Sequence, residues 1–272
     1  LSAEHRFFVR RVSRYGGGRF DRGDSLFGRG RRSLLIGRSE DRWAVSDRFR
    51  ASWGTHGGQD YLHFAPMFGH QYSHVWIDFK GIHDPLMREK GIDYFENSRR
   101  ATYAQRQYAI ENAGGWADYG ADVWGLTACD GPGDFRMGGR QYFSYSARGP
   151  GERDDGTLAP TALLGSYPFA PEIVEPAVGN LYRRYGADIF GRYGFLDAFN
   201  PTIRSRPPEP FKHGELRPGA GWVDTDYLGI DQGPIVAMIE NHRTGLVWQT
   251  MRRNPYIRRG LARAGFTGGW LD

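Results

Sequence analysis

The chain has 272 residues, of which 39 are Gly and 15% are aromatic, and its mean hydropathy is −0.60. This composition indicates a loop-rich globular protein with a sizeable core and excludes an intrinsically disordered chain. No apolar run approaches the roughly 20 residues of a membrane-spanning helix, and the single cysteine, Cys129, excludes an internal disulfide and a cysteine-based zinc site.

The formal net charge of +5 is concentrated at the start of the chain. Residues 1–50 contain 13 Arg, 4 Asp and 2 Glu, a charge of +7, which leaves −2 for the remainder. Residues 1–48 are rich in Arg and Gly and show no helical or strand period. We interpret them as a basic tail or, with slight preference, as a truncated or misread part of a larger gene. We predict no nucleic-acid partner, and DNA binding through this segment is the weakest alternative.

The globular part, residues 49–272, opens with an aromatic segment at 68–82 that contains two histidines. His70 and His74 are one helical turn apart, a spacing that could hold a metal. Because no HExxH pattern and no third ligand accompany them, we interpret both as core or hydrogen-bonding histidines. We therefore predict no metal and no other cofactor.

A helix is predicted from Asp93 to Asn112. Asp93 can cap its first turn, and Glu96, three residues later, can reach back to the cap as in a capping box. Apolar and aromatic residues then recur at three-to-four spacing, and two glycines follow the last residue. Glu96, Asn97 and Arg100 crowd the first turns, where backbone N–H groups favour anionic or hydroxyl partners.

Residues 116–135 form a loop by composition, with Gly and Asp between aromatic residues. Trp116, Tyr119 and Trp124 are open to two interpretations. They could pack under the loop, or they could offer flat faces to sugar rings, whose C–H faces are apolar.

Further helices are expected in the second half of the chain, opened by acids or proline. They are predicted at Pro160–Leu164, from Pro171, from Pro234 and, as a final pair, up to Ala264. Asp154 and Asp155 precede the first of these, and Asp231 precedes the third. Residues 201–218 are expected to form a surface connector or lid, and period-two strands are scarce throughout.

Helices that start with acids after aromatic loops favour an all-α ring or bundle whose loops build a pocket. Paired carboxylates in such a pocket are what glycoside hydrolysis needs, because one protonates the leaving oxygen and the other acts as base or nucleophile. No GxSxG elbow, Walker loop or GxGxxG fingerprint is present, which argues against serine hydrolases, nucleotide hydrolases and dinucleotide oxidoreductases. Cys129 has no local His that would activate it as a nucleophile.

Several longer motifs occur in order between Phe68 and Phe266. They read HQYSHVWIDFKGI, IDYFENSRRATYAQRQYAI, VWGLTACDGP, YSARG, DDGTLAPTALLGSYPFAPEIV, RYGFLDAFN, WVDTDYLGIDQGPIVAMIENHRTGLVW and MRRNPYIRRGLARAGF. Together they resemble the bacterial glucoamylase-like (glycoamylase) domain, a group that includes endo-β-1,2-glucanases.

This resemblance implies an (α/α)6 toroid, carboxylic-acid hydrolysis of a bacterial β-glucan, most of all a β-1,2-glucan, and a periplasmic or secreted location. Members of the group carry a further run of helices before the HQYSH-like segment, and the acids thought to be catalytic lie there. In this chain the Arg-rich residues 1–48 stand at that place. We therefore expect an incomplete toroid, acting as a monomer on a glucan oligo- or polysaccharide.

Candidate site residues follow from this interpretation. The acids expected to be catalytic are Glu96, Asp130, Asp155 and Glu240. The residues expected to contact sugar are Tyr72, Trp76, Asn97, Arg100, Trp124, Arg148 and Asp154. Two alternatives stay open, namely a non-catalytic module that grips polysaccharide with its aromatic loops and an inactive truncated chain.

Overall fold

The computed structural model describes residues 50–272. The helices are α3 (Phe68–Trp76), α4 (Pro85–Lys90), α5 (Tyr94–Glu111), α6 (Pro160–Leu164), α7 (Pro171–Ile189), α8 (Gly229–Arg243), α9 (Leu246–Arg252), α10 (Pro255–Arg263) and the short 3-10 helix Gly269–Leu271. The strands are β1 (Trp53–His56), β2 (Gln59–Leu62), β3 (Ala128–Cys129), β4 (Phe135–Met137), β5 (Arg140–Tyr142), β6 (Ser146–Ala147), β7 (Phe190–Gly191), β8 (Gly194–Phe195), β9 (Phe199–Asn200), β10 (Glu215–Arg217) and β11 (Gly221–Val223).

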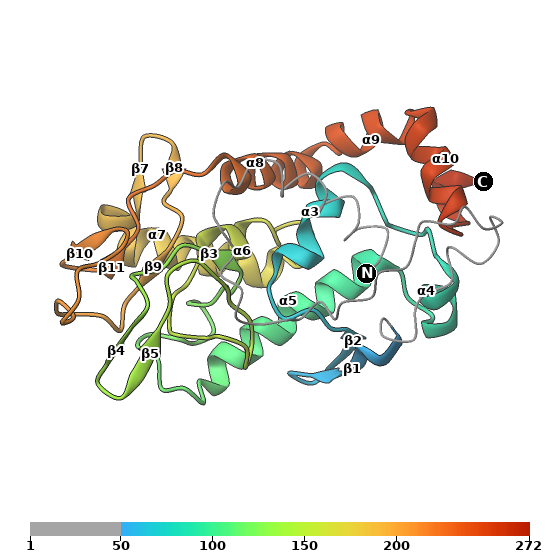
Figure 1. Cartoon of the computed structure of the whole chain (residues 1–272). Helices are drawn as coiled ribbons and strands as arrows, with labels where there is room; N and C mark the ends of the chain where they lie inside the picture. The colour runs from blue at the N-terminus through green and yellow to red at the C-terminus, as the bar shows by residue number, and fades with distance from the viewer. Residues whose placement is uncertain (1–49) are drawn as a thin grey trace, which may run out of the picture.

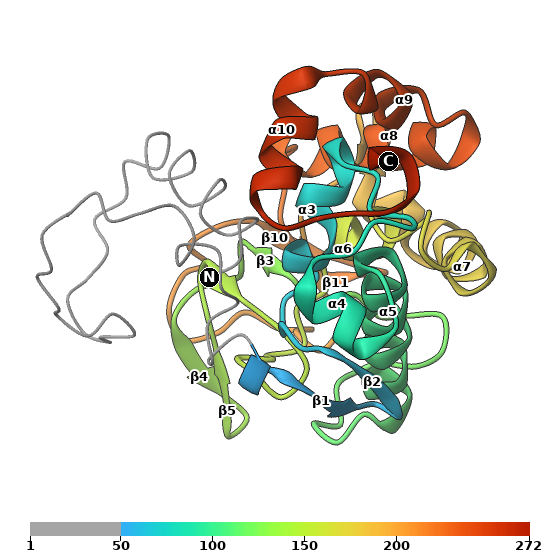
Figure 2. The ribbon, with the colours of Figure 1, turned by 90° about the vertical axis from the view of Figure 1, so that its right-hand side faces the viewer.

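The helices dominate, and the strands form small antiparallel sheets between them. In Figures 1 and 2, α8, α9 and α10 lie along one edge of the molecule, and the hairpins β1–β2 and β4–β5 lie along the opposite edge. Helix α3 contacts α5, α8 and α9, so it joins the two edges. The prediction of an all-α fold is corrected to a helix-rich fold with small sheets.

The sheets escaped prediction because their strands are too short to show a period of two. Strands β4 and β5 have three residues each and are joined by Gly138 and Gly139, whose φ values are 59° and 77°. Such a pair of left-handed residues is the turn that a tight hairpin needs. A three-stranded sheet has the order β10-β11-β9, with Trp222 opposite Asn200.

The helix predicted from Asp93 is confirmed as α5. Asp93 Oδ1 accepts a hydrogen bond of 2.8 Å from the Glu96 backbone N–H, and the helix ends at Asn112 in the left-handed conformation, with φ of 44°. The second half of the capping box is not formed. Glu96 Oε1 instead accepts from Arg100 Nε at 2.8 Å, because its partner one turn later offers a charged donor.

The helices predicted at Pro160 and Pro171 and the final pair are confirmed. The predicted start at Pro234 is wrong. Helix α8 starts at Gly229 and carries Pro234 in its interior, where proline has no N–H to donate to the Ile230 carbonyl. Asp231 consequently lies inside the first helical turn, and its side chain is buried.

Within residues 50–272, the largest apolar core lies between α6, α7, sheet β10-β11-β9 and the loop at 116–135. Trp116, Tyr119 and Trp124 all belong to it, so they pack under the loop. His70 and His74 are also buried, and they bond the Phe64 carbonyl and the Ser98 hydroxyl, respectively, at 3.0 Å. Their interpretation as hydrogen-bonding core histidines is confirmed. Among the helices of residues 50–272, none combines the length and the apolar character that a membrane crossing requires.

Candidate active site

Four aspartates from separate parts of the chain converge on one place. Asp130 directly follows β3, Asp197 lies just before β9, Asp224 directly follows β11, and Asp231 is in the first turn of α8. One carboxylate oxygen from each of Asp130, Asp197 and Asp224 lies within 4.8 Å of the other two. We call these four residues the Asp cluster. Asp130 is half-buried and the other three are buried.

Backbone hydrogen bonds hold the cluster together. The Asp130 N–H donates to Asp197 Oδ2 at 2.8 Å, which ties the end of β3 to the segment before β9. The Asp224 N–H donates to the Ala198 carbonyl at 2.9 Å, and the Asp197 N–H donates to the Asp226 carbonyl at 3.1 Å. The pairing of β9 with β11 therefore continues past the strand ends and holds the carboxyl groups of Asp197 and Asp224 beside each other.

The carboxyl groups of Asp197 and Asp231 are close enough to share a hydrogen bond. Because an ionised carboxylate only accepts, such a bond requires a proton on one of the two groups. Burial, followed by the charge of Asp231, raises the pKa of Asp197 well above its usual range. Burial is also the main cause that raises the pKa of Asp231 to about 6. Both shifts favour a proton on the pair at a higher pH than an ordinary carboxyl group would keep one.

Asp224 adds a further carboxyl group whose pKa is raised, first by burial and then by the charges of Asp226 and Asp130. One oxygen of Asp197, one of Asp224 and one of Asp231 are buried without a conventional hydrogen-bond donor from the described residues. Like charges this close repel strongly, so protonation or a bound cation must relieve the repulsion.

Two tyrosines adjoin the Asp cluster. Tyr72, on α3, is half-buried, and its pKa is raised mainly by burial and further by the charges of Asp231 and Asp197. Tyr145, which precedes β6, is 62% exposed and lies within electrostatic reach of Asp130 and Asp197. The cluster thus has aromatic neighbours of amphipathic character, one of them open to solvent.

Of the four acids expected to be catalytic, only Asp130 belongs to the cluster. Glu96 pairs with Arg100, Glu240 accepts from the Thr244 hydroxyl at 2.6 Å, and Asp155 is fully buried against Arg148. None of these three has a hydrogen bond or ion pair to the cluster within the described part of the chain. The four acids that were expected to be catalytic therefore do not form one site. Acids at helix ends and in tight loops bond nearby donors, which is why helix-start position alone misled the prediction.

Three of the expected sugar contacts are buried inside the protein. Trp124 is 2% exposed, and Asn97 accepts from the Leu62 N–H at 2.7 Å, which docks β2 onto α5. Arg148 is 0% exposed and donates to Asp155 and to the carbonyls of Cys129, Phe143 and Ser144. These side chains are corrected to structural roles, because no ligand can reach them in this conformation.

The other four expected contacts are accessible to different degrees. Tyr72 adjoins the Asp cluster, and Trp76 is 53% exposed at the last residue of α3. Arg100 donates to the Asp60 carbonyl at 2.9 Å, besides its pairing with Glu96. Asp154 accepts from the hydroxyls of Tyr108 and Tyr119, away from the cluster.

The sequence contained a signal for the residues that were missed. Asp197 and Asp224 each follow buried apolar residues, in the stretches GFLDAF and GWVD. An acid next to buried strand residues is unusual, since a lone charge there is costly. Asp231 was noticed only as a residue ahead of a helix, and Tyr145 carried no signal beyond its aromatic ring. Cys129 is buried and the pKa of its thiol is raised by burial, so it is not an activated nucleophile.

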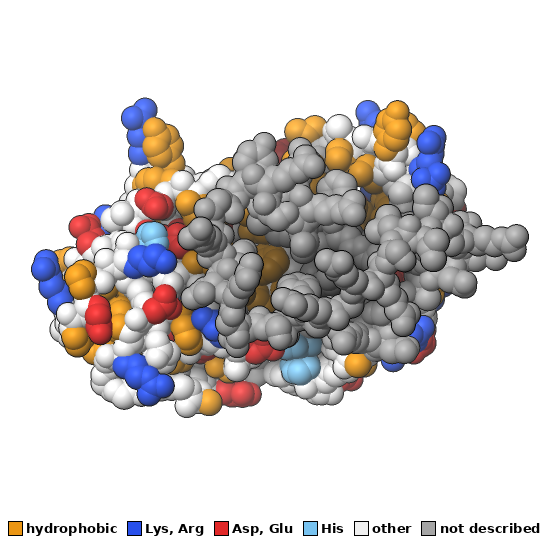
Figure 3. Space-filling model, in the orientation of Figure 1, with side chains coloured by type: hydrophobic (Ala, Val, Ile, Leu, Met, Phe, Trp, Pro, Cys, Tyr) orange, Lys and Arg blue, Asp and Glu red, His pale blue; other side chains and the backbone are white. Residues whose placement is uncertain are grey.

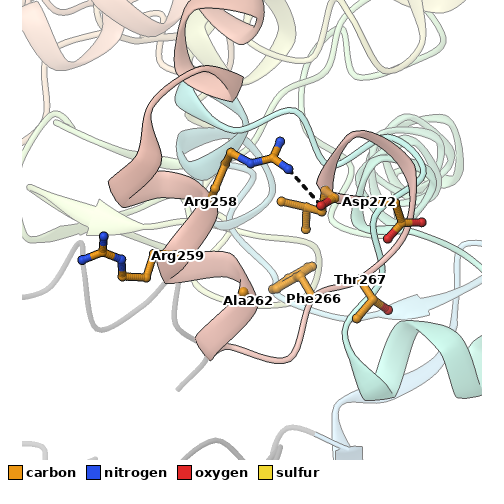
Figure 4. A pocket seen from close by; sticks show the side chains of 7 residues that line it. Arg258, Arg259, Ala262, Phe266, Thr267 and Asp272 are labelled. Carbon is orange, nitrogen blue, oxygen red and sulfur yellow. Dashed lines mark hydrogen bonds between the residues drawn. The ribbon is translucent and has the colours of Figure 1, made fainter.

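The rest of the described surface is mixed in character. A pocket of about 410 Å³ lies between α10 and the last residues, where Arg258 donates to the Leu271 carbonyl at 2.9 Å (Figure 4). It contains no member of the Asp cluster. Figure 3 shows Lys and Arg interspersed with Asp and Glu over the described part of one face, without a patch of a single sign there.

The fold and the site together define a helix-rich protein with a cluster of aspartates whose pKa values are raised. The chain belongs to the Glycoamylase family, described as "Putative glucoamylase", which matches residues 37–255.

Three known proteins are similar to this chain in sequence or in structure. The chain is 32% identical over 242 residues to the exo β-1,2-glucooligosaccharide sophorohydrolase (non-reducing end) of Parabacteroides distasonis. It is 32% identical to the endo-β-1,2-glucanase from Chitinophaga pinensis, solved with sophorotriose and glucose, with a TM-score of 0.67. A Bacteroides uniformis structure that carries the family's description is 36% identical, with a TM-score of 0.65.

The shared region is only part of each relative. It covers 81% of this chain and 29% of the sophorohydrolase, 84% of this chain and 49% of the endo-glucanase, and 80% of this chain and 47% of the Bacteroides uniformis protein. The chain therefore spans less than half the length of these relatives.

Proposed function

We propose that this chain acts as part of a glycoside hydrolase on β-1,2-linked glucose oligomers or glucan. The observation that carries the proposal is the buried Asp cluster, in which Asp197 and Asp231 lie next to each other and have raised pKa values. A carboxyl group that stays protonated near neutral pH is the general acid that glycoside cleavage requires. The names of the two β-1,2-glucan-degrading relatives support the choice of linkage.

The proposed reaction transfers one proton to the leaving oxygen and removes one proton from the attacking water. The Asp197–Asp231 pair donates its proton to the glycosidic oxygen, which leaves as a sugar hydroxyl while the bond to C1 breaks. Water adds to C1 and loses its own proton to an ionised carboxylate of the cluster, so the cluster as a whole gives up one proton and regains one. Asp130 is the most accessible carboxylate of the cluster, and we assign it to the substrate-facing side.

Other parts of the proposal rest on the family resemblance. We infer that the complete fold is an (α/α)6 toroid, to which α3, α5, α7 and α8 contribute helices. We also propose a monomeric protein that works in the periplasm or outside the cell. Tyr145 and Tyr72 are proposed to contact the sugar, because their rings adjoin the cluster and suit the apolar faces of glucose.

The test is hydrolysis of linear β-1,2-gluco-oligosaccharides by the chain, followed through release of glucose and sophorose. Asp197→Asn and Asp231→Asn should each lower the rate by about 10²-fold or more, since each replaces one of the two carboxyl groups that hold the proton. Asp122→Asn removes an exposed acid outside the cluster and should leave the rate unchanged. Unchanged rates in both cluster variants would refute the assignment. Saturable binding of the oligosaccharide without cleavage by the wild-type chain would favour a non-catalytic carbohydrate-binding module.

A further inference from the structure

A second pocket, of about 390 Å³, lies beside the hairpin β4–β5 and shares no residue with the Asp cluster. The last turn of α5, the loop after it, strand β5 and the loop at 148–156 form its walls. The side chains that matter for the argument are Tyr108, Trp116, Arg140, Phe143, Arg153 and Asp154.

Arg140 is held in place while part of its guanidinium stays unused. Its Nη2 donates to the Gly115 carbonyl at 3.0 Å, and its guanidinium carbon lies 4.3 Å from the centre of the Trp116 ring. Its Nη1, by contrast, is buried and has no partner among the described residues. A buried donor without an acceptor is costly, so the Arg140 guanidinium keeps an unmet demand for a hydrogen-bond acceptor.

Arg153 approaches the same pocket from the opposite loop. Its guanidinium carbon lies 4.2 Å from the centre of the Phe143 ring, and its Nε donates to the Ser146 hydroxyl at 2.6 Å. The residue has φ of 50°, a left-handed conformation that residues other than glycine rarely adopt. The surrounding loop therefore imposes this conformation, and it directs a second guanidinium to the pocket.

The acid that lines the pocket does not neutralise either arginine. Asp154 Oδ2 accepts from the Tyr108 hydroxyl at 3.0 Å, and Oδ1 accepts from the Tyr119 hydroxyl at 2.8 Å. No ion pair joins Asp154 to Arg140 or Arg153 within the described region. Burial also raises the pKa of Asp154, which favours its neutral form. The pocket is therefore left with two positive charges and at most one negative charge.

We propose that this pocket binds an oxyanion, either a carboxylate or a phosphate group. Stacked guanidinium groups present fixed forks of N–H donors, which match the oxygens of both groups. A neutral sugar fits less well, because Trp116 is only 8% exposed and guanidinium groups already cover the Trp116 and Phe143 rings. The inference does not depend on glycoside hydrolysis at the Asp cluster.

Calorimetric titration at low ionic strength tests the site with inorganic phosphate, glucose 6-phosphate and glucose. Both phosphates should bind saturably and glucose should not. Similar affinities for the two phosphates would identify a free oxyanion as the ligand, and tighter binding of glucose 6-phosphate would identify an anionic group carried on a sugar. Absence of saturable phosphate binding to the wild-type chain would overturn the proposal.

Variants of the two pocket arginines, compared with a control variant, test whether phosphate binds in this pocket. Arg140→Gln and Arg153→Gln should each weaken phosphate binding by about tenfold, the effect of one charge-assisted hydrogen bond. Arg153→Lys keeps the charge without the fork and should fall between Arg153→Gln and the wild type. Arg183→Gln removes an exposed charge from α7 and should bind as the wild type does. Equal weakening in Arg183→Gln would mean a general charge effect and would also overturn the proposal. Because Arg153 is exposed, its variants should fold even where Arg140→Gln does not.

Discussion

Removal of the Asp155 carboxylate should destabilise the protein strongly, because Asp155 is the only ion-pair partner of Arg148 in the described structure. Arg148 Nε donates to Asp155 Oδ1 at 2.8 Å and Nη2 donates to Oδ2 at 2.9 Å, and both side chains are 0% exposed. The carboxylate also accepts from the N–H groups of Phe143, at 3.0 Å, and Thr157, at 3.1 Å. It thereby ties the loop at 143–157 to a single buried charge.

The expected loss in the free energy of unfolding follows from the groups that lose their partner. Breaking one side of a buried ion pair costs about 3–5 kcal/mol, because the remaining charge stays buried without a partner. We expect Asp155→Ala to reach the upper part of this range, since it also leaves two backbone N–H groups without an acceptor. Asp155→Asn keeps an amide oxygen for one of these donors and should lie near the lower end, about 3 kcal/mol.

Urea denaturation followed by circular dichroism measures these changes. Glu172→Gln, in the surface pair of Arg99 and Glu172, is the control and should change the free energy of unfolding by about 0–1 kcal/mol. A change below about 1 kcal/mol for Asp155→Asn would refute the reasoning. If Asp155→Asn kept full stability and lost hydrolysis, the original assignment of Asp155 as a catalytic acid would be restored.

Three further outcomes are expected. Burial and the charge of Asp231 raise the pKa of Asp197 well above its usual range, so kcat/KM should fall as pH rises through this raised pKa; Asp224→Asn removes a nearby like charge and should move the fall to lower pH, and a pH–rate profile without that shift would count against the pair. Asp93→Ala should lower the free energy of unfolding by about 1 kcal/mol through loss of the α5 cap, measured by thermal denaturation with Asp93→Asn as a milder control. Treatment with EDTA should leave hydrolysis unchanged because we assign proton exchange to the cluster, whereas a loss that calcium restores would point to a bound cation.

Most helices of residues 50–272 were predictable because their signals are local, although α3 and α4 were not among the predicted helices. The cap at Asp93, the prolines at the starts of α6, α7 and α10 and the three-to-four spacing of apolar residues lie within a few residues of each other. The start of α8 was missed because Pro234 has the same appearance at the first position of a helix as in its interior. The small sheets were missed because pairs such as Ala128–Cys129 with Ser146–Ala147 depend on contacts far apart in sequence.

The site was much less predictable than the helices. Asp130 was found, whereas Asp197, Asp224 and Asp231 were not among the predicted acids. The apolar residues before Asp197 and Asp224 are a local signal, but they do not show which acids meet, because the cluster forms only through the pairing of β9 with β11 and the start of α8. Aromatic side chains led to the opposite error, because a buried residue was predicted to contact sugar. Trp124 sits in a Gly-rich loop, as a sugar platform would, yet its ring fills the core beneath that loop.

Burial separates the two kinds of acid in this chain. Asp155 is buried beside Arg148, a permanent cation, so its charge is matched and it serves the fold. Asp197 and Asp231 are buried beside each other and near two more carboxyl groups, an arrangement that destabilises the ionised forms and that a fold has no structural reason to assemble. Clusters of like-charged acids with raised pKa values concentrate at functional sites. The absence of a described cationic partner for Asp197 and Asp231, rather than their proximity to helix starts, is therefore the property that marks these residues for chemistry.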